Sequence, residues 1–154
     1  MPQDLQAKLP ELVPKVNAWV QTLIARIERE GTPISEELQA LARRLGVRQA
    51  EAIRLLEVEH LPPPEDPELC RIFFASGMLG ANMTGMTLGY HILVLQGCAH
   101  PKFLAHDFRH VYQFEEAGSL DNFLSIYAAQ VLACGHNNAP LEWDARLQEK
   151  LATS

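Results

Sequence analysis

The feature that most constrains the fold of this chain is a β-prone run that lies between segments with helical patterns. The run occupies residues 87–95, "TLGYHILVL", and the stretch that leads into it is rich in glycine. Glycines at positions 77, 80, 85 and 89 mark turns or allow close approach of backbones. The sequence therefore predicts a hairpin or a pair of short strands, with residues 87–95 as the best-defined strand.

The N-terminal part of the chain predicts helices. Apolar residues recur at spacings of three and four over residues 11–30, and Gly31 ends this pattern. Ser35 is typical of an N-cap, because acids follow it in the first turn, and the helix that it begins runs to Gly46. We expect a third helix over residues 48–57, "RQAEAIRLLE".

A proline-rich stretch separates these helices from the rest of the chain. Residues 60–69, "HLPPPEDPEL", contain three consecutive prolines, which remove backbone donors and favour extended backbone. We therefore expect residues 1–66 to form a helical preface and residues 67–154 to form the core.

The C-terminal part again predicts helices. We expect a helix over residues 103–117 that Gly118 ends, and another over residues 120–134 that Gly135 caps. A last helix begins at about Leu141. The order of helices, a small sheet and further helices points to an α+β fold.

Composition is consistent with a single domain over residues 1–154. The chain is 47% hydrophobic and 21% charged, a composition that can bury a core without disulfides. It contains no apolar run of transmembrane length and no N-terminal signal pattern, so we expect no membrane association. Three widely spaced cysteines favour a reducing compartment, the cytoplasm.

The charge balance argues against nucleic acid as a partner. The net charge is -6, whereas phosphate binding needs clustered Lys and Arg. The spacing within residues 35–57 is also that of a helix-turn-helix, but four Arg and four Glu in this segment leave no net attraction for phosphate. We interpret this segment as a helical hairpin that packs on the core.

The strongest chemical signal is a pair of histidines within "LAHDFRHVYQFEEAG", residues 104–118. His106 and His110 are four positions apart, so on a helix they lie on one face and can bind one metal ion. Catalytic zinc takes three protein ligands and keeps one position open. Glu142 is the best candidate for the third ligand, followed by Asp144 and His136.

Asp107 and the helix around it suggest two interpretations of this pair. In zinc-hydrolase helices, the acid after the first histidine is the general base that takes a proton from water. A purely structural histidine pair is the alternative, in which other partners satisfy the buried ring nitrogens. The apolar flank of the helix, formed by Leu104, Phe108 and Val111, turns the histidines inward in either case.

The chain resembles the zincin metallopeptidases over residues 86–147. The resemblance is carried by "MTLGYHILVL", by "LAHDFRHVYQFEEAGSLDNFLSIYAAQ" and by "NNAPLEWDARL". These segments are most similar to a small bacterial group of minimal gluzincin-like domains. That group combines a strand, an H-E-x-x-H helix, a "Q-x-E-x-x-G" segment and a downstream "P-L-E-x-x-A" segment. Here the histidine motif reads HDFRH.

The resemblance implies a zincin-like fold and one zinc ion per chain, bound by His106, His110 and Glu142. Residues 87–94 match the edge strand on which zincins bind an extended peptide or protein substrate. Asp107 takes the place of the catalytic glutamate and is one methylene shorter. The substrate-binding residues of this strand would be Thr87, Leu88, Gly89 and Tyr90.

Other polar residues are candidates for supporting roles. Tyr112, Tyr127 and His136 could stabilise an oxyanion, and the sequence does not choose among them. Asp144 could lie in the second shell of the metal, and Arg109 could pair with Asp107 or with another acid.

The sequence thus favours a zinc-dependent metallopeptidase with Asp107 as a shortened general base. The main alternative is a weak or inactive zincin-fold module that binds metal or peptide without turnover. A helical His-Asp phosphohydrolase that uses the His106–Asp107 pair is a distant third interpretation, because the β-prone run fits that fold less well. The sequence does not predict the oligomeric state.

Overall fold

The computed structural model describes residues 3–76 and 83–153, with side chains from residue 10 onward. Within these ranges the chain has six α-helices and one four-stranded sheet, which confirms the predicted α+β class. The helices are α1 (Gln3–Glu30), α2 (Glu36–Arg44), α3 (Pro67–Ser76), α4 (Pro101–Ala117), α5 (Leu120–Cys134) and α6 (Pro140–Thr153). The strands are β1 (Thr32–Pro33), β2 (Arg54–Val58), β3 (Gly85–Leu88) and β4 (His91–Leu95), and short 3₁₀ helices span Ala50–Ala52 and His136–Asn138.

The sheet is mixed and has the strand order β1-β2-β4-β3. β4 pairs in parallel with β2 and antiparallel with β3, while β1 pairs antiparallel with β2. Within the described residues, β3 therefore lies at one edge of the sheet with one side of its backbone unpaired. This edge strand also contacts α4.

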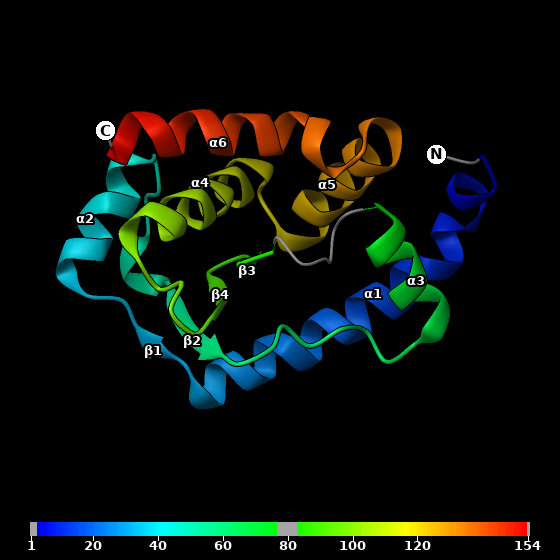
Figure 1. Ribbon diagram of the computed structural model, residues 1–154, viewed down its shortest axis with the longest axis horizontal. Coiled ribbons are helices and arrows are strands. Elements are labelled where there is room, and N and C mark those ends of the chain that lie inside the picture. Colours follow the sequence, from blue (N-terminus) through cyan, green and yellow to red (C-terminus); the bar gives the residue numbers. More distant parts are fainter. Residues whose placement is uncertain (1–2, 77–82, 154) are drawn as a thin grey trace.

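The central strand β4 is buried on both faces. Ile92 and Val94 pack into a cluster with α2 and α4, whereas Leu93 packs against α1 and β2. This alternation follows from the two-residue period of a strand. Figure 1 shows the resulting layers: α1 runs below the sheet, α4 lies above it, and α6 lies along α4 on the outer side.

Helix α1 is longer than predicted: it begins at Gln3, whereas the sequence pattern predicts a start at residue 11. Its apolar stripe is buried as the periodicity indicates, with Val20, Leu23 and Ile27 packed under the sheet. Gly31 follows its end, where the Gly31 N–H donates to the carbonyl of Ile27 at 2.8 Å.

Both ends of α2 match the sequence prediction. The Ser35 hydroxyl accepts a hydrogen bond from the Leu38 N–H at 3.2 Å, which is the expected N-cap. At the other end Gly46 has a φ of +100°, and the Val47 N–H donates to the carbonyl of Ala42 at 3.1 Å. This is the Schellman arrangement, which favours glycine because of its positive φ.

The predicted helix over residues 48–57 is wrong. The segment forms a 3₁₀ turn over Ala50–Ala52 and then strand β2, which pairs with β4 along its whole length. Tertiary pairing overrides helical propensity here, because Val58 and Leu56 join the apolar cluster between the sheet and α1. The helical-hairpin interpretation of residues 35–57 is therefore wrong, and residues 1–66 contribute two strands to the sheet.

The other differences concern the middle of the chain. The expected single strand over residues 87–95 is two strands, joined by a turn in which Gly89 has a φ of +71°, so the hairpin interpretation is the correct one. Helix α3 was not expected after the prolines. The predicted turns at Gly77 and Gly80 lie outside the described residues.

The C-terminal helices follow the prediction closely. Helix α4 begins at Pro101, two residues before the expected start, and ends at Ala117. Gly118 follows with a φ of +89°, and Ser119 is the N-cap of α5. The predicted bounds of α5 are correct, and α6 begins at Pro140, one residue before the expected start.

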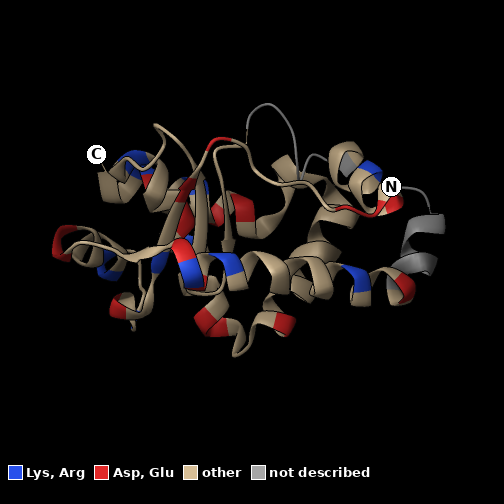
Figure 2. Cartoon of the chain, turned by 90° about the horizontal axis from the view of Figure 1, so that it is seen from below, with Lys and Arg blue, Asp and Glu red and all other residues tan. Residues whose placement is uncertain are grey.

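Charged residues of both signs are spread over the helices. Figure 2 shows acidic segments between the basic ones on the face that it presents. Pairs such as Arg26–Glu30 at 3.3 Å and Arg48–Glu116 at 2.9 Å bring opposite charges together. In the described part of the chain, no helix is both long enough and apolar enough to cross a membrane.

Two glycines with positive φ offer a matched test of this packing. A Cβ at Gly46 would lie 2.6 Å from Cδ1 of Tyr112, whereas a Cβ at Gly97, with a φ of +85°, would contact nothing within 4 Å. The Tyr112 ring cannot yield freely, because the Arg109 guanidinium lies 3.9 Å from its centroid. We expect Gly97→Ala to lower the free energy of unfolding by about 1 kcal/mol, and Gly46→Ala by about 2–4 kcal/mol. Urea unfolding of both variants tests this, and equal losses would contradict it.

Candidate metal centre

Helix α4 brings the two predicted histidines together on one face. The ring centroids of His106 and His110 are 4.8 Å apart, as the four-residue spacing requires. His110 is buried, and His106 is partly exposed to the cavity that the site opens into. The Nε2 atoms of both rings contact the same side chain, Glu142.

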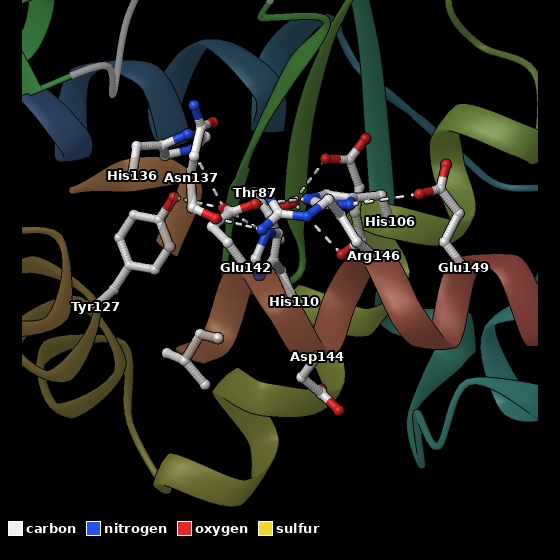
Figure 3. A network of polar contacts seen from close by, with 12 residues as sticks. Thr87, His106, His110, Tyr127, His136, Asn137, Glu142, Asp144, Arg146 and Glu149 are labelled. Atoms are coloured by element: carbon white, nitrogen blue, oxygen red, sulfur yellow. Dashed lines mark hydrogen bonds and ion pairs between the residues drawn. The ribbon is translucent and has the colours of Figure 1, made fainter. Parts of the chain in front are cut away.

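Glu142 reaches the histidines because α6 packs along α4. Its Oε2 lies 2.9 Å from His106 Nε2, and its Oε1 lies 3.0 Å from His110 Nε2. Figure 3 shows the carboxylate on α6 directed at both rings. The potential ligand atoms of the three residues all lie within 4.8 Å of one another, so this group could hold a metal ion.

The orientation of His110 supports a cation at this point. The Gln113 amide N–H groups donate to the Leu141 carbonyl and to Asp144 Oδ2, both at 2.9 Å. The Gln113 oxygen therefore faces His110 Nδ1 at 2.8 Å, where it accepts a hydrogen bond from an Nδ1 that carries a proton. If Nδ1 carries the proton of a neutral ring, Nε2 presents a lone pair to the Glu142 carboxylate. A metal ion or a second proton between these two acceptors relieves their repulsion.

The donor set and its spacing fit zinc. In a tetrahedral site with bonds of about 2.0–2.2 Å, ligand atoms lie roughly 3.4 Å apart. The imidazole-to-carboxylate distances of 2.9 and 3.0 Å are close to this separation. Two imidazoles and one carboxylate leave the fourth position of such a site open.

Glu142 is buried, with an exposed fraction of 3%, and four side chains stabilise its charge. The Tyr127 hydroxyl from α5 donates to Oε1 at 2.6 Å, and His136 Nε2 lies 3.4 Å from the same atom. Burial alone would raise the pKa of Glu142, but its contacts with His106, His110 and His136 hold that pKa well below its usual range.

The Glu142 charge also shifts the pKa values of its partners His110 and Tyr127. Burial by itself would lower the pKa of His110, and the hydrogen bond and charge of Glu142 raise it on balance. The pKa of Tyr127 is raised well above its ordinary value, by burial first and then by the nearby Glu142 charge. Tyr127 therefore keeps its proton and acts as a donor near neutral pH.

Asp107 lies in a different environment in the same cavity. It is buried, and the Thr87 hydroxyl donates to its Oδ1 at 3.2 Å. Burial raises the pKa of Asp107 to about 6, against the opposing effect of the two neighbouring histidines. Gly85 lets the backbone of β3 lie close to the Asp107 carboxylate. A Cβ at this position would lie 2.7 Å from the Leu93 carbonyl oxygen and 3.2 Å from Asp107 Oδ2.

Arg109 pairs with Asp144 rather than with Asp107. Its Nε donates to Asp144 Oδ2 at 2.8 Å, and the same carboxylate accepts from Gln113. Asp144 thus holds Gln113 in place, and it is not part of the group of potential metal ligands that His106, His110 and Glu142 form. The pKa of Asp144 is lowered: burial opposes the shift, and the hydrogen bonds from Arg109 and Gln113 outweigh it.

The cavity has a volume of about 640 Å³ and is walled by helices α1, α3, α4, α5 and α6 together with strand β3. Of the predicted site residues, those that line it are His106, Asp107, His110, Glu142, Thr87, Leu88, Tyr127 and His136. The remaining ones lie elsewhere. Tyr112 packs under Arg109 and beside Gly46, and Gly89 lies in the hairpin turn.

Tyr90 also lies away from the cavity. Its hydroxyl donates to Glu115 Oε2 at 2.8 Å, and its ring packs edge-on against Phe114 with centroids 5.0 Å apart. Burial and Glu115 raise the pKa of Tyr90 to about 12. The predicted edge strand over residues 87–94 is therefore corrected to β3, Gly85–Leu88, since the residues after the turn belong to the central strand.

Sequence reasoning missed several polar residues of the site, among them Gln113, Arg146 and Glu149. Gln113 is three positions after His110, a spacing that places it on the same helical face. Arg146 and Glu149 follow Glu142 by four and seven positions and line the cavity with it. The i+4 and i+7 spacing from a candidate ligand is a signal that could have identified both.

Comparison of the chain with protein-family models, with curated proteins and with solved structures found no match. Its function is therefore inferred from the site itself.

The burial of Asp107 predicts how the stability of the metal-free protein depends on pH. Its folded pKa of about 6 lies above the ordinary value of 3.8, so the folded state disfavours the charged carboxylate. This penalty is fully present above pH 6 and disappears as the pH falls below the unfolded value. We expect Asp107→Asn to stabilise the chelator-treated protein by roughly 1–3 kcal/mol at pH 7, with a smaller gain near pH 4.5.

Urea unfolding at the two pH values measures this effect. Glu59→Gln at an exposed position provides the control, which should change stability little at either pH. A loss of stability in Asp107→Asn at pH 7 would show that partners of the carboxylate outweigh its burial.

Proposed function

We propose that this protein is a zinc-dependent hydrolase of the zincin type that acts on peptides or proteins. In this proposal His106, His110 and Glu142 hold the ion, and Asp107 is the general base. The observation that carries the proposal is the position of the Glu142 carboxylate between the two Nε2 atoms, with the other nitrogen of His110 fixed by Gln113. Metal-ligating histidines commonly have such a fixed second nitrogen.

The chain's own residues can supply the remaining chemistry. A divalent ion in such a site polarises a carbonyl group and makes a water molecule more acidic. Asp107 follows the first histidine and lines the same cavity, where its raised pKa suits a base that works near neutral pH. Tyr127 and His136 lie at Glu142 Oε1 and are donors that could face a developing oxyanion.

The edge strand supports a peptide as the substrate. Residues of β3 line the cavity beside Asp107, and one side of the strand is unpaired within the described residues. An extended peptide can add to such an edge by backbone hydrogen bonds. Thr87 and Leu88 are the members of the predicted substrate-binding set that remain candidates, since Gly89 and Tyr90 do not line the cavity.

Metal analysis tests the ligand assignment. We expect about one zinc per chain in freshly purified wild-type protein, by elemental mass spectrometry. The variants His106→Ala and Glu142→Gln should lose most of this metal, because each removes one of three ligands. His60→Ala, at an exposed position away from the site, should retain it. A wild-type protein that takes up no zinc, even when zinc is supplied, would mean that the histidine pair is structural.

Asp107 itself tests whether the site is catalytic. Its side chain is one methylene shorter than glutamate, and a misplacement of about 1 Å can cost on the order of a hundredfold in rate. We therefore expect Asp107→Glu to raise the cleavage rate of an unstructured peptide mixture strongly, and Asp107→Asn to abolish cleavage. The assay is mass spectrometry of the peptide products at matched metal content. If the zinc-loaded protein and both variants cleave nothing, the site belongs to a metal-binding or peptide-binding module without turnover.

A further inference from the structure

Arg146 is a cationic side chain of the cavity with no role in the chemistry described above. It lies one turn after Glu142 on the inner face of α6, is partly buried and lines the cavity. Figure 3 shows its side chain extending from α6 toward the region of Glu142 and Asn137. Its Nη2 donates to the Asn137 carbonyl, which fixes the direction of the guanidinium group.

The charge of Arg146 has no carboxylate partner among residues 10–76 and 83–153. The acids on its own helix face are directed elsewhere: Glu142 contacts the histidines and Tyr127, and Glu149 lies 3.7 Å from His106 Nδ1. Arg109, by contrast, is paired with Asp144 at 2.8 Å. An arginine in a cavity without an acidic partner is suited to an anionic group of a ligand.

The opposite wall of the cavity is apolar. It is formed by aromatic side chains of α1 and α3, including Trp19 and Phe73, whose ring centroids are 5.2 Å apart. Phe74, with an exposed fraction of 55%, also lines the cavity. The cavity thus offers one cationic position near the candidate metal centre and one large apolar surface across from it.

We propose that Arg146 binds a free carboxylate of the substrate, so that the site acts on compounds with a terminal carboxylate and a large apolar side chain. The substrate class is therefore peptides cleaved near their C-terminus, or acylated apolar amino acids. This inference rests on the proposed hydrolase function. The guanidinium group has five donors in a planar fork and uses one of them on Asn137, so a bidentate pair with a carboxylate remains available.

A second role for Arg146 makes a different prediction. If its charge served only to offset those of Glu142 and Glu149 on the same helix face, Arg146 would be a structural residue. In that case its replacement would lower thermal stability and leave the choice between ligands unchanged. A measured preference for a carboxylate over its neutral analogue, and its loss in Arg146 variants, therefore distinguishes ligand binding by Arg146 from a purely structural role.

The experiment compares two probes that differ in one group, 3-phenylpropanoate and 3-phenylpropanamide. Calorimetric titration is carried out on wild type, Arg146→Met, Arg146→Lys and the control Arg44→Met, which alters an exposed arginine of α2. We expect the wild type and Arg44→Met to bind the carboxylate about tenfold more tightly than the amide. Arg146→Met should bind the two probes about equally, and Arg146→Lys, which keeps the charge and loses the fork, should show a reduced preference.

Two results would overturn the inference. One is a wild type without preference for the carboxylate, and the other is a preference that persists in Arg146→Met, since a bound metal or another cation would then be the recognition element. Circular dichroism verifies that each variant is folded. If Arg146→Met does not fold, Arg146→Lys provides the comparison, because it keeps the charge. Metal content measured on the same samples distinguishes failure of the hydrolase proposal from failure of the proposal for Arg146. Absence of zinc contradicts the hydrolase, whereas a preference lost only on replacement of Arg146 still supports carboxylate recognition.

Discussion

The carboxylate of Glu142 is buried between α4 and α6, and a buried charge needs partners that compensate the loss of water. Its partners come from three directions: His106 and His110 from α4, Tyr127 from α5, and His136 from the short turn before α6. The packing of these helices therefore determines the polar cluster, and the cluster in turn fixes how α6 lies on α4. A hydrophobic seam alone would not impose this orientation, because apolar contacts are not directional.

Two carboxylates share one cavity, and their environments shift their pKa values in opposite directions. Glu142 is kept ionised by imidazoles and a phenol, whereas the pKa of Asp107 is raised by burial against β3. The sheet contributes to this difference through Gly85, which lets the strand backbone approach, and through Thr87, the donor to Asp107. Environments that separate the pKa values of neighbouring acids are typical of sites that divide binding and proton transfer between them.

The sequence predicted those parts of the fold that local interactions decide. Ser35 and Gly46 bound α2 because a side-chain cap and a positive φ are local properties. Residues 48–57 were misassigned because their helical propensity is overridden by pairing with β4, a partner distant in the chain. In the site, the histidine pair could be predicted from its spacing. The roles of Gln113 and Arg146 could not, because Gln113 is oriented by Leu141 and Asp144. The acids one turn away from Arg146 on α6, Glu142 and Glu149, contact histidines instead.

The separation of the cluster along the chain has a consequence for biosynthesis. His106 and Glu142 are 36 positions apart, and α5 is made between them. While a ribosome has released α4 but not α6, the nascent chain carries two imidazoles without the carboxylate that joins them. Two ligands hold a divalent ion far less firmly than three, so the proposed ion would contribute little to the early folding of α4. Docking of α6 completes the group of donors, and occupancy of the site would then report that the C-terminal half has assembled.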